Sequence, residues 1–229
     1  MPATLTWLGH GSWLLHTGRH SLVIDPFLDD SPAAPVKSDQ VQADFILISH
    51  GHADHVSDAA KIAKRTGAAV ISNFEICNWL AAKGVQNTIA HNLGGGSDHP
   101  WGRVKLTLAH HSSSLPDGAN GGNPSGFLLT LNEPRKTIYF ACDTGLFYDM
   151  KLIGAAGLDL AVLPIGDLFT MGPDDSIEAI QLLHPKRVVP SHYDTWPPIA
   201  QDARAWAERV KAETTAEPIV IRPGEKIRL

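Results

Sequence analysis

Short apolar segments alternate with polar breaks along the whole chain. Most of these segments either place apolar residues at every second position or are apolar throughout, and both patterns are typical of β-strands. The pattern predicts that residues 126–131 and 137–142 pair as a hairpin and that residues 219–229 form a short strand or hairpin around Pro223-Gly224. We expect the other strands at residues 3–8, 12–16, 21–25, 44–49, 68–72, 103–109, 159–164 and 186–190.

Helical periodicity appears between these strands. Ser57 and Asp174 are the expected N-caps of two of the helices. Residues 29–42 are rich in Pro, Ser and Asp, and residues 92–102 are rich in Gly, so both are expected to be loops. Alternating strands and helices predict a layered α/β domain, and 229 residues suffice for a single domain over 1–229. The expected helices cover residues 59–67, 74–83, 174–183 and 200–211.

A dense group of polar residues follows the buried strand 44–49. His50, His52, Asp54 and His55 lie within six positions of one another. Imidazole nitrogens and carboxylate oxygens are the ligands that a borderline divalent cation prefers. A single ion cannot take four ligands from so short a loop, so we expect two adjacent ions to divide them, with Gly51 permitting the turn. The alternative is a polar loop that is merely rich in histidine.

Three more strand ends carry similar residues. His110 and His111 follow strand 103–109, and because neighbouring residues on extended backbone face opposite ways, at most one of them should reach a metal. Asp143 ends strand 137–142, and its two carboxylate oxygens could bridge two cations; the alternative is an aspartate that caps the next turn. His192 follows the strand 186–190. Active sites gather at strand ends in α/β sheets.

His10 stands between two glycines after the first strand, as expected for a residue on a tight turn at the wall of a pocket. A surface turn histidine is the alternative interpretation. The loop 169–173 and the segment 193–196 are the other expected pocket walls.

The order of residues 50–55 resembles the H-x-H-x-D-H signature of the metallo-β-lactamase superfamily. The resemblance implies a four-layer αββα sandwich, with two mixed sheets face to face and helices outside. Alanine, histidine and serine at 109–113 resemble the form A-x-H-S-S, in which His111 is the ligand and His110 faces away. The implied ligands are His50, His52 and His111 for one ion, Asp54, His55 and His192 for the other, and Asp143 between them.

Further motifs resemble a narrower group, the UPF0173 metal-dependent hydrolases, which is similar to the ascorbate-6-phosphate lactonase branch and, more distantly, to the N-acyl phosphatidylethanolamine phospholipase D type. Asp194 and Trp196 depart from the neutral small residue and the phenylalanine expected there. The departure concerns substrate contacts rather than metal ligands. The motifs are Trp7-Leu8-Gly9-His10, Asp143-Thr144-Gly145-Leu146-Phe147, Pro164-Ile165-Gly166, Phe169-Thr170-Met171-Gly172-Pro173 and Pro190-Ser191-His192-Tyr193.

These residues predict a binuclear metal-dependent hydrolase that acts on a small ester, lactone or phosphodiester through a hydroxide held between two divalent ions. Zinc is the first expectation, with manganese or iron as alternatives. Asp54, Asp143 and His10 are the predicted catalytic residues, and the substrate is expected to contact His10, Thr170, Tyr193 and Trp196. A non-catalytic metal-binding or regulatory protein and a nuclease of the same fold are the competing interpretations. A flavodiiron-like oxidoreductase would carry a carboxylate in place of His52.

Composition narrows the partners and the location. The net charge of −5 and the lack of a Lys/Arg run argue against nucleic acid as a partner. No apolar stretch reaches the ~18 residues of a membrane span, and residues 1–17 do not resemble a signal peptide, so we expect no membrane association and a cytoplasmic location. Cys77 and Cys142 are too few for a disulfide scaffold, and Cys142 is expected to be a buried free thiol. The expected partner is a small-molecule substrate, and the sequence leaves a homo-oligomer open.

Overall fold

A computed structural model describes residues 3–229, which form two seven-stranded sheets. The first sheet has the order β14-β1-β2-β3-β4-β5-β6 and the second the order β13-β12-β11-β10-β9-β8-β7. The strands of the first sheet are β1 (Thr4–Trp7), β2 (Trp13–His16), β3 (Ser21–Ile24), β4 (Phe45–Leu47), β5 (Ala69–Asn73), β6 (Thr88–His91) and β14 (Lys226–Arg228). Those of the second are β7 (Gly96–His99), β8 (Gly102–Leu108), β9 (Ser125–Leu131), β10 (Lys136–Phe140), β11 (Leu160–Pro164), β12 (Arg187–Ser191) and β13 (Glu217–Pro218).

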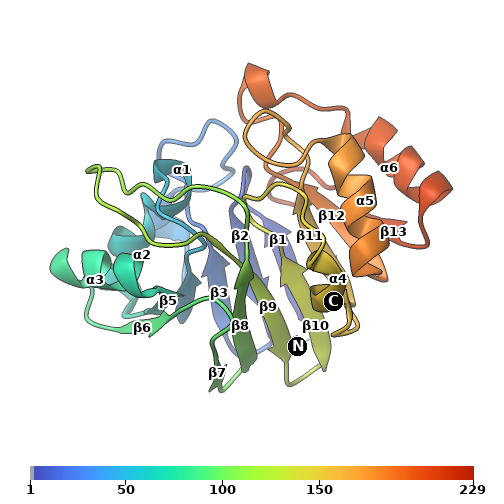
Figure 1. The fold of residues 1–229 in the computed structure, drawn as a ribbon. Helices are drawn as coiled ribbons and strands as arrows, with labels where there is room; N and C mark the ends of the chain where they lie inside the picture. The colour runs from blue at the N-terminus through green and yellow to red at the C-terminus, as the bar shows by residue number, and fades with distance from the viewer. Residues whose placement is uncertain (1–2) are drawn as a thin grey trace.

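The helices lie outside the pair of sheets, with α2 and α3 beside the first sheet and α4, α5 and α6 beside the second (Figure 1). This arrangement confirms the αββα sandwich. Within residues 3–229 no helix is long and apolar enough to cross a membrane. The helices are α1 (Ala53–Val56), α2 (Ala59–Thr66), α3 (Phe74–Ala82), α4 (Met150–Gly154), α5 (Pro173–Leu183) and α6 (Ala203–Glu213), with the short 3-10 turns η1 (Ser38–Gln40) and η2 (Pro197–Ile199).

The main core fills the space between the two sheets. Leu5 and Leu15 of the first sheet and Phe127 and Leu129 of the second are fully buried in one apolar cluster. Each such side chain stabilises the fold by roughly 1.5–3 kcal/mol relative to exposure. A second apolar cluster lies between the first sheet and its helices, and includes Val70 of β5. The sheets are therefore a rigid frame, and their strand ends are fixed in position.

The strand predictions agree well with the structure, and the hairpin prediction is confirmed by the antiparallel pair β9 and β10. The loop prediction for 92–102 is wrong, because β7 forms there as an edge strand that pairs with β8. Its residues are one glycine and three polar side chains, so no apolar alternation marks it. Of the two forms predicted for residues 219–229, the short strand is confirmed as β14, which pairs with β1 rather than forming a hairpin. Strand β6 and helices α1 and α4 were not predicted.

Two predicted caps differ from those in the structure. Ser57 ends α1 and donates its hydroxyl proton to the carbonyl of Ala53, while Asp58 is the N-cap of α2. Helix α5 begins with Gly172 as N-cap and Pro173 as the first helical residue, so Asp174 lies inside the first turn. Proline is favoured at the first helical position, since the amide proton it lacks would have no partner there. The loop 29–42 contains the short turn η1.

Strand direction explains where polar groups gather. Strands β3, β4, β5 and β6 are parallel neighbours, and so are β10, β11, β12 and β13. The carboxyl ends of parallel strands meet at one edge of a sheet, where active sites of α/β proteins form. Each sheet thus brings several strand-end loops together at the same end of the sandwich.

Candidate metal centre

A first group of three imidazoles forms where β4 and β8 end. His50 follows β4, His52 is the N-cap of α1, and His111 follows β8. One nitrogen of each lies within 4.8 Å of the others. Nδ1 of His52 is 3.0 Å from Nε2 of His50 and 3.2 Å from Nε2 of His111. Three imidazoles at this spacing can converge on one divalent ion.

A second group lies beside it and joins both sheets. It consists of His10 after β1, Asp54 and His55 in α1, and His192 after β12, with one ligand atom of each within 4.8 Å of the others. His10, His55 and His192 are fully or almost fully buried. Three of its members are the residues predicted to hold the second ion, and His10 is the fourth.

Asp143 lies between the two groups. Its Oδ2 is 3.6 Å from Nε2 of His111 and 3.9 Å from Nε2 of His50 in the first group. The same oxygen is 3.1 Å from Nε2 of His192 and 3.3 Å from Nε2 of His55 in the second. A single carboxylate oxygen thus lies within 4 Å of four imidazoles, which is the position of a group that both sites share.

Asp25 was not among the predicted site residues. It follows β3, and its Oδ2 lies 3.0 Å from Nδ1 of His55. Its carboxylate also accepts hydrogen bonds from the backbone amide and the hydroxyl of Ser49. A carboxylate bound to one imidazole nitrogen orients the other nitrogen towards a metal. Its place at a strand end, like that of Asp143, was the signal in the sequence.

Buried nitrogens without partners test whether a metal fits these groups. Nε2 of His55 and both ring nitrogens of His192 are buried and make no hydrogen bond. Unpaired buried polar atoms are costly, so they imply a partner that the polypeptide does not supply. The donors are imidazole nitrogens and carboxylate oxygens, which suit zinc, manganese or iron. The described residues therefore fit divalent cations.

The electrostatics favour uptake of positive charge. Burial lowers the pKa of His50, His52 and His111, so these imidazoles are neutral and ready to bind. Burial alone would raise the pKa of Asp143, but the neighbouring His192 and His55 hold it well below its usual range. Burial would lower the pKa of His55, but the Asp143 and Asp25 carboxylates raise it well above its usual value. A metal that binds His55 must therefore displace a proton.

Two glycines allow the loops to approach closely. A Cβ on Gly11 would lie 2.8 Å from Cε1 of His55, so any larger residue would push this ring away. Gly51 was expected to supply unusual backbone angles, but its φ does not fall in the left-handed region. Instead, a Cβ there would lie 3.1 Å from Leu115 and 3.2 Å from the carbonyl of Ser114. Gly51 is therefore needed for close packing of the loop after β8.

The paired histidines after β8 face different surroundings. The ring of His110 stacks on Phe147 with 5.0 Å between ring centroids, whereas His111 lies in the first imidazole group. His111→Ala should weaken metal binding by at least ~10-fold, the lower end of what loss of a group supporting a ligand costs, and should lower hydrolysis. His110→Ala serves as the matched control and should retain both properties. Metal analysis and turnover of the two variants would contradict the assignment if the order were reversed.

The predicted substrate contacts are only partly brought together. Trp196 packs edge-on against His10, with 4.9 Å between ring centroids, so it lines the second group. Tyr193 is buried and stacks on Trp7, with 5.2 Å between ring centroids, which directs its ring away from the imidazoles. Thr170 makes its hydrogen bonds within its own loop, to Asp167 and Met171.

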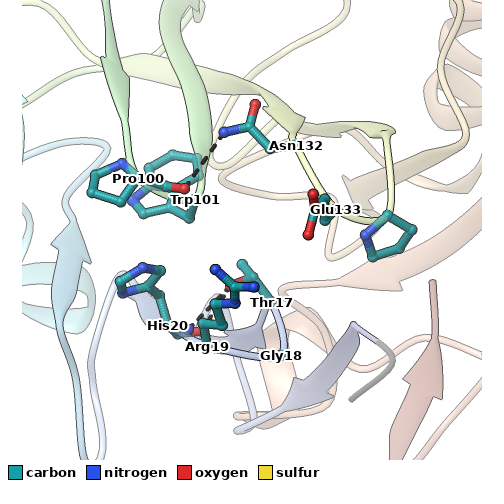
Figure 2. A pocket seen from close by; sticks show the side chains of 9 residues that line it. Thr17, Gly18, Arg19, His20, Pro100, Trp101, Asn132 and Glu133 are labelled. Carbon is teal, nitrogen blue, oxygen red and sulfur yellow. Dashed lines mark hydrogen bonds between the residues drawn. The ribbon is translucent and has the colours of Figure 1, made fainter.

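A cavity of about 390 Å³ lies at the other end of the strands (Figure 2). It is lined by the turns that precede β3, β8 and β10, the strands whose far ends lead to Asp25, His111 and Asp143. Figure 2 shows Arg19 and Glu133 on opposite sides of it, contributed by different sheets. None of the predicted site residues lines this cavity.

Comparison with known proteins places this site in context. A family model described as the beta-lactamase superfamily domain matches residues 20–193. The chain is similar to a UPF0173 metal-dependent hydrolase of Heliobacterium modesticaldum, with 46% identity over 98% of this chain and 97% of that protein. It is also similar to a UPF0173 metal-dependent hydrolase of Thermus thermophilus, with 48% identity over 97% of each chain. Among solved structures, Igni18, a metallo hydrolase from Ignicoccus hospitalis, matches with a TM-score of 0.90 and 33% identity over 100% of this chain and 99% of that one.

Proposed function

The chain belongs to the metallo-β-lactamase superfamily, within its UPF0173 group of metal-dependent hydrolases, and from this premise we propose that it works with two divalent ions on a small ester, lactone or phosphodiester. The chain is a metal-dependent hydrolase, as its relatives are named. The number of ions and the class of substrate are the proposed part.

The position of Asp143 is the observation that carries the proposal. Its Oδ2 lies within 4 Å of Nε2 atoms from both imidazole groups, and its pKa is lowered so that it is ionised at neutral pH, although burial opposes this. A single ion would need only one of these groups. Two groups of donors surround one shared carboxylate, and each donor is either neutral or can lose its proton to a metal. This arrangement instead supports two adjacent ions.

Three side chains on each side would hold an ion besides the shared carboxylate: His50, His52 and His111 of the first group, and Asp54, His55 and His192 of the second, without its fourth member His10. Two bound ions supply Lewis acidity and make water acidic enough to act as a nucleophile near neutral pH. The chain's own contribution is to orient the donors, as Asp25 does for His55. Zinc is the first candidate because five of these donors are imidazoles, and manganese and iron are the alternatives.

Exposed apolar side chains on the loop between β11 and α5 support a substrate with an apolar part. Leu168 and Phe169 are 63% and 60% exposed on the loop between β11 and α5. The same loop binds the residue after Asp143, since the amide of Met171 donates to the carbonyl of Thr144. The loop therefore holds two exposed apolar side chains within three residues of its contact with Thr144, the residue after Asp143, and we infer that they contact a substrate's apolar part.

A substrate panel on protein loaded separately with zinc and with manganese would test the proposal. We expect hydrolysis of at least one class among generic esters, lactones and phosphodiesters, at a rate that depends on the metal. The control is protein loaded in the same way but carrying Asp143→Asn. If protein that holds two ions per chain hydrolyses none of the three classes faster than this control, the proposed substrate class is wrong.

A further inference from the structure

The backbone of His10 is anchored between the two sheets. Its carbonyl oxygen accepts hydrogen bonds from Nε1 of Trp7 at 2.9 Å, Oγ of Ser191 at 3.1 Å and the backbone amide of His192 at 3.2 Å. Trp7 ends β1 in the first sheet, and Ser191 ends β12 in the second. The position of the His10 ring is therefore set by the frame of the fold.

Both ring nitrogens of His10 have partners. Nε2 lies 3.0 Å from Oδ2 of Asp54, and Nδ1 lies 2.7 Å from Oγ1 of Thr195. His10 is fully buried and Thr195 is 7% exposed. The two partners come from different segments, since Asp54 lies in α1 and Thr195 in the loop after His192. A continuous chain of hydrogen bonds thus connects Thr195, His10 and Asp54.

The direction of these hydrogen bonds follows from the groups themselves. Asp54 is an ionised carboxylate if it is a metal ligand, as the proposed function takes it to be, because ligands bind a metal in their deprotonated form. An ionised carboxylate only accepts, so Nε2 of His10 must carry a proton. His10 is fully buried, and its ring centroid lies 3.9 Å from that of His192, so the neutral imidazole is favoured because a buried site disfavours the charged form. A neutral imidazole has only one proton, so Nδ1 accepts and the Thr195 hydroxyl donates.

We propose that Thr195 is a positioning residue of the metal centre, which donates its hydroxyl proton to Nδ1 of His10 and thereby fixes the tautomer whose Nε2–H holds the Asp54 carboxylate in one orientation. The inference rests on the proposed function, because it takes Asp54 to be a metal ligand. It gives His10 a supporting role, because its two ring nitrogens bond to Asp54 and Thr195, whereas the ring nitrogens of His192 make no hydrogen bond. Supporting partners of this kind typically change metal affinity ~10–100-fold.

The tautomer can be measured directly by long-range ¹H–¹⁵N NMR on histidine-labelled protein, metal-free and after titration with zinc. We expect His10 to show a protonated Nε2 and an unprotonated Nδ1 in both states. A protonated Nδ1, or an Nε2 that binds zinc, would overturn the proposal. This readout does not depend on catalysis, so it stands even if no hydrolytic substrate is found.

Two variants of Thr195 test its hydroxyl. Thr195→Val keeps the shape but removes the donor, so the His10 tautomers should mix and zinc affinity, measured by competition with a chelator, should fall ~10-fold. Thr195→Ser keeps the hydroxyl and should show the wild-type His10 tautomer and the wild-type zinc affinity. Thr215→Val removes a hydroxyl from an exposed position and is the matched control. If Thr195→Val leaves both the His10 tautomer and the zinc affinity unchanged, the proposed role of Thr195 is refuted. If Thr195→Val does not fold, the His10 tautomer in the wild-type protein and in Thr195→Ser still tests the proposal, because a protonated Nδ1 in either would refute it.

Discussion

Removal of divalent metal by a chelator is expected to abolish hydrolysis and to lower the melting temperature of this chain by ~5–10 °C. An ion present at ~100 times its dissociation constant stabilises the folded state by ~2.7 kcal/mol. For a chain of about this length, each kcal/mol corresponds to ~2–4 °C. Activity and thermal unfolding should be measured on the same preparation before and after chelation.

The physical cause is the crowding of donors in the metal-free centre. Nε2 of His55 and both nitrogens of His192 are buried without hydrogen bonds, and Asp54 and Asp143 are ionised close to them. Bound cations satisfy these atoms and offset the negative charge, so their loss destabilises the fold. Adding zinc back should restore both properties. Full turnover by protein shown by elemental analysis to be metal-free would exclude the metal-hydrolase mechanism.

The candidate ligands could be predicted from the sequence because their signal is local. One short loop, directly after an apolar strand, contains four of them: His50, His52, Asp54 and His55. Their density and order can be seen without knowledge of the fold. The sheet order could not be predicted in the same way. Strand β7 consists of Gly96–His99 and carries no apolar alternation, because it is an edge strand stabilised by pairing with β8 rather than by burial.

Contacts between segments that lie far apart in the chain could not be predicted from the sequence either. Thr195 and His10 are 185 positions apart, and only the packing of the two sheets brings them together. Asp25 and His55 are 30 positions apart, and they meet because β3 and β4 are parallel neighbours that end at the same edge. The stacking of Tyr193 on Trp7 likewise depends on the packing of the two sheets. Tyr193 follows the candidate ligand His192 directly in the sequence, but a sequence neighbour of a ligand need not line the metal centre.

Asp143→Asn is expected to leave a folded protein whose turnover is lower by at least ~100-fold, the scale seen when one electrostatic element of an active site is removed. Asparagine keeps the shape of the side chain, but its amide oxygen is a poor shared ligand for two cations. Each imidazole group would keep its other donors, so we expect partial loss of metal rather than complete loss. Metal content and turnover should be measured together on the same sample.

The control for this variant is Asp98→Asn, which removes the same charge from an exposed ion pair with Arg103 on β7 and β8. It should leave metal content and turnover unchanged, because exposed pairs of this kind contribute little and none of the candidate metal-binding groups found within residues 3–229 includes Asp98. Asp143, by contrast, has one oxygen within 4 Å of four imidazole nitrogens. A variant Asp143→Asn that holds two ions per chain and turns over at a near-normal rate would show that this oxygen is not shared between the ions, and that Asp143 serves only the turn after β10.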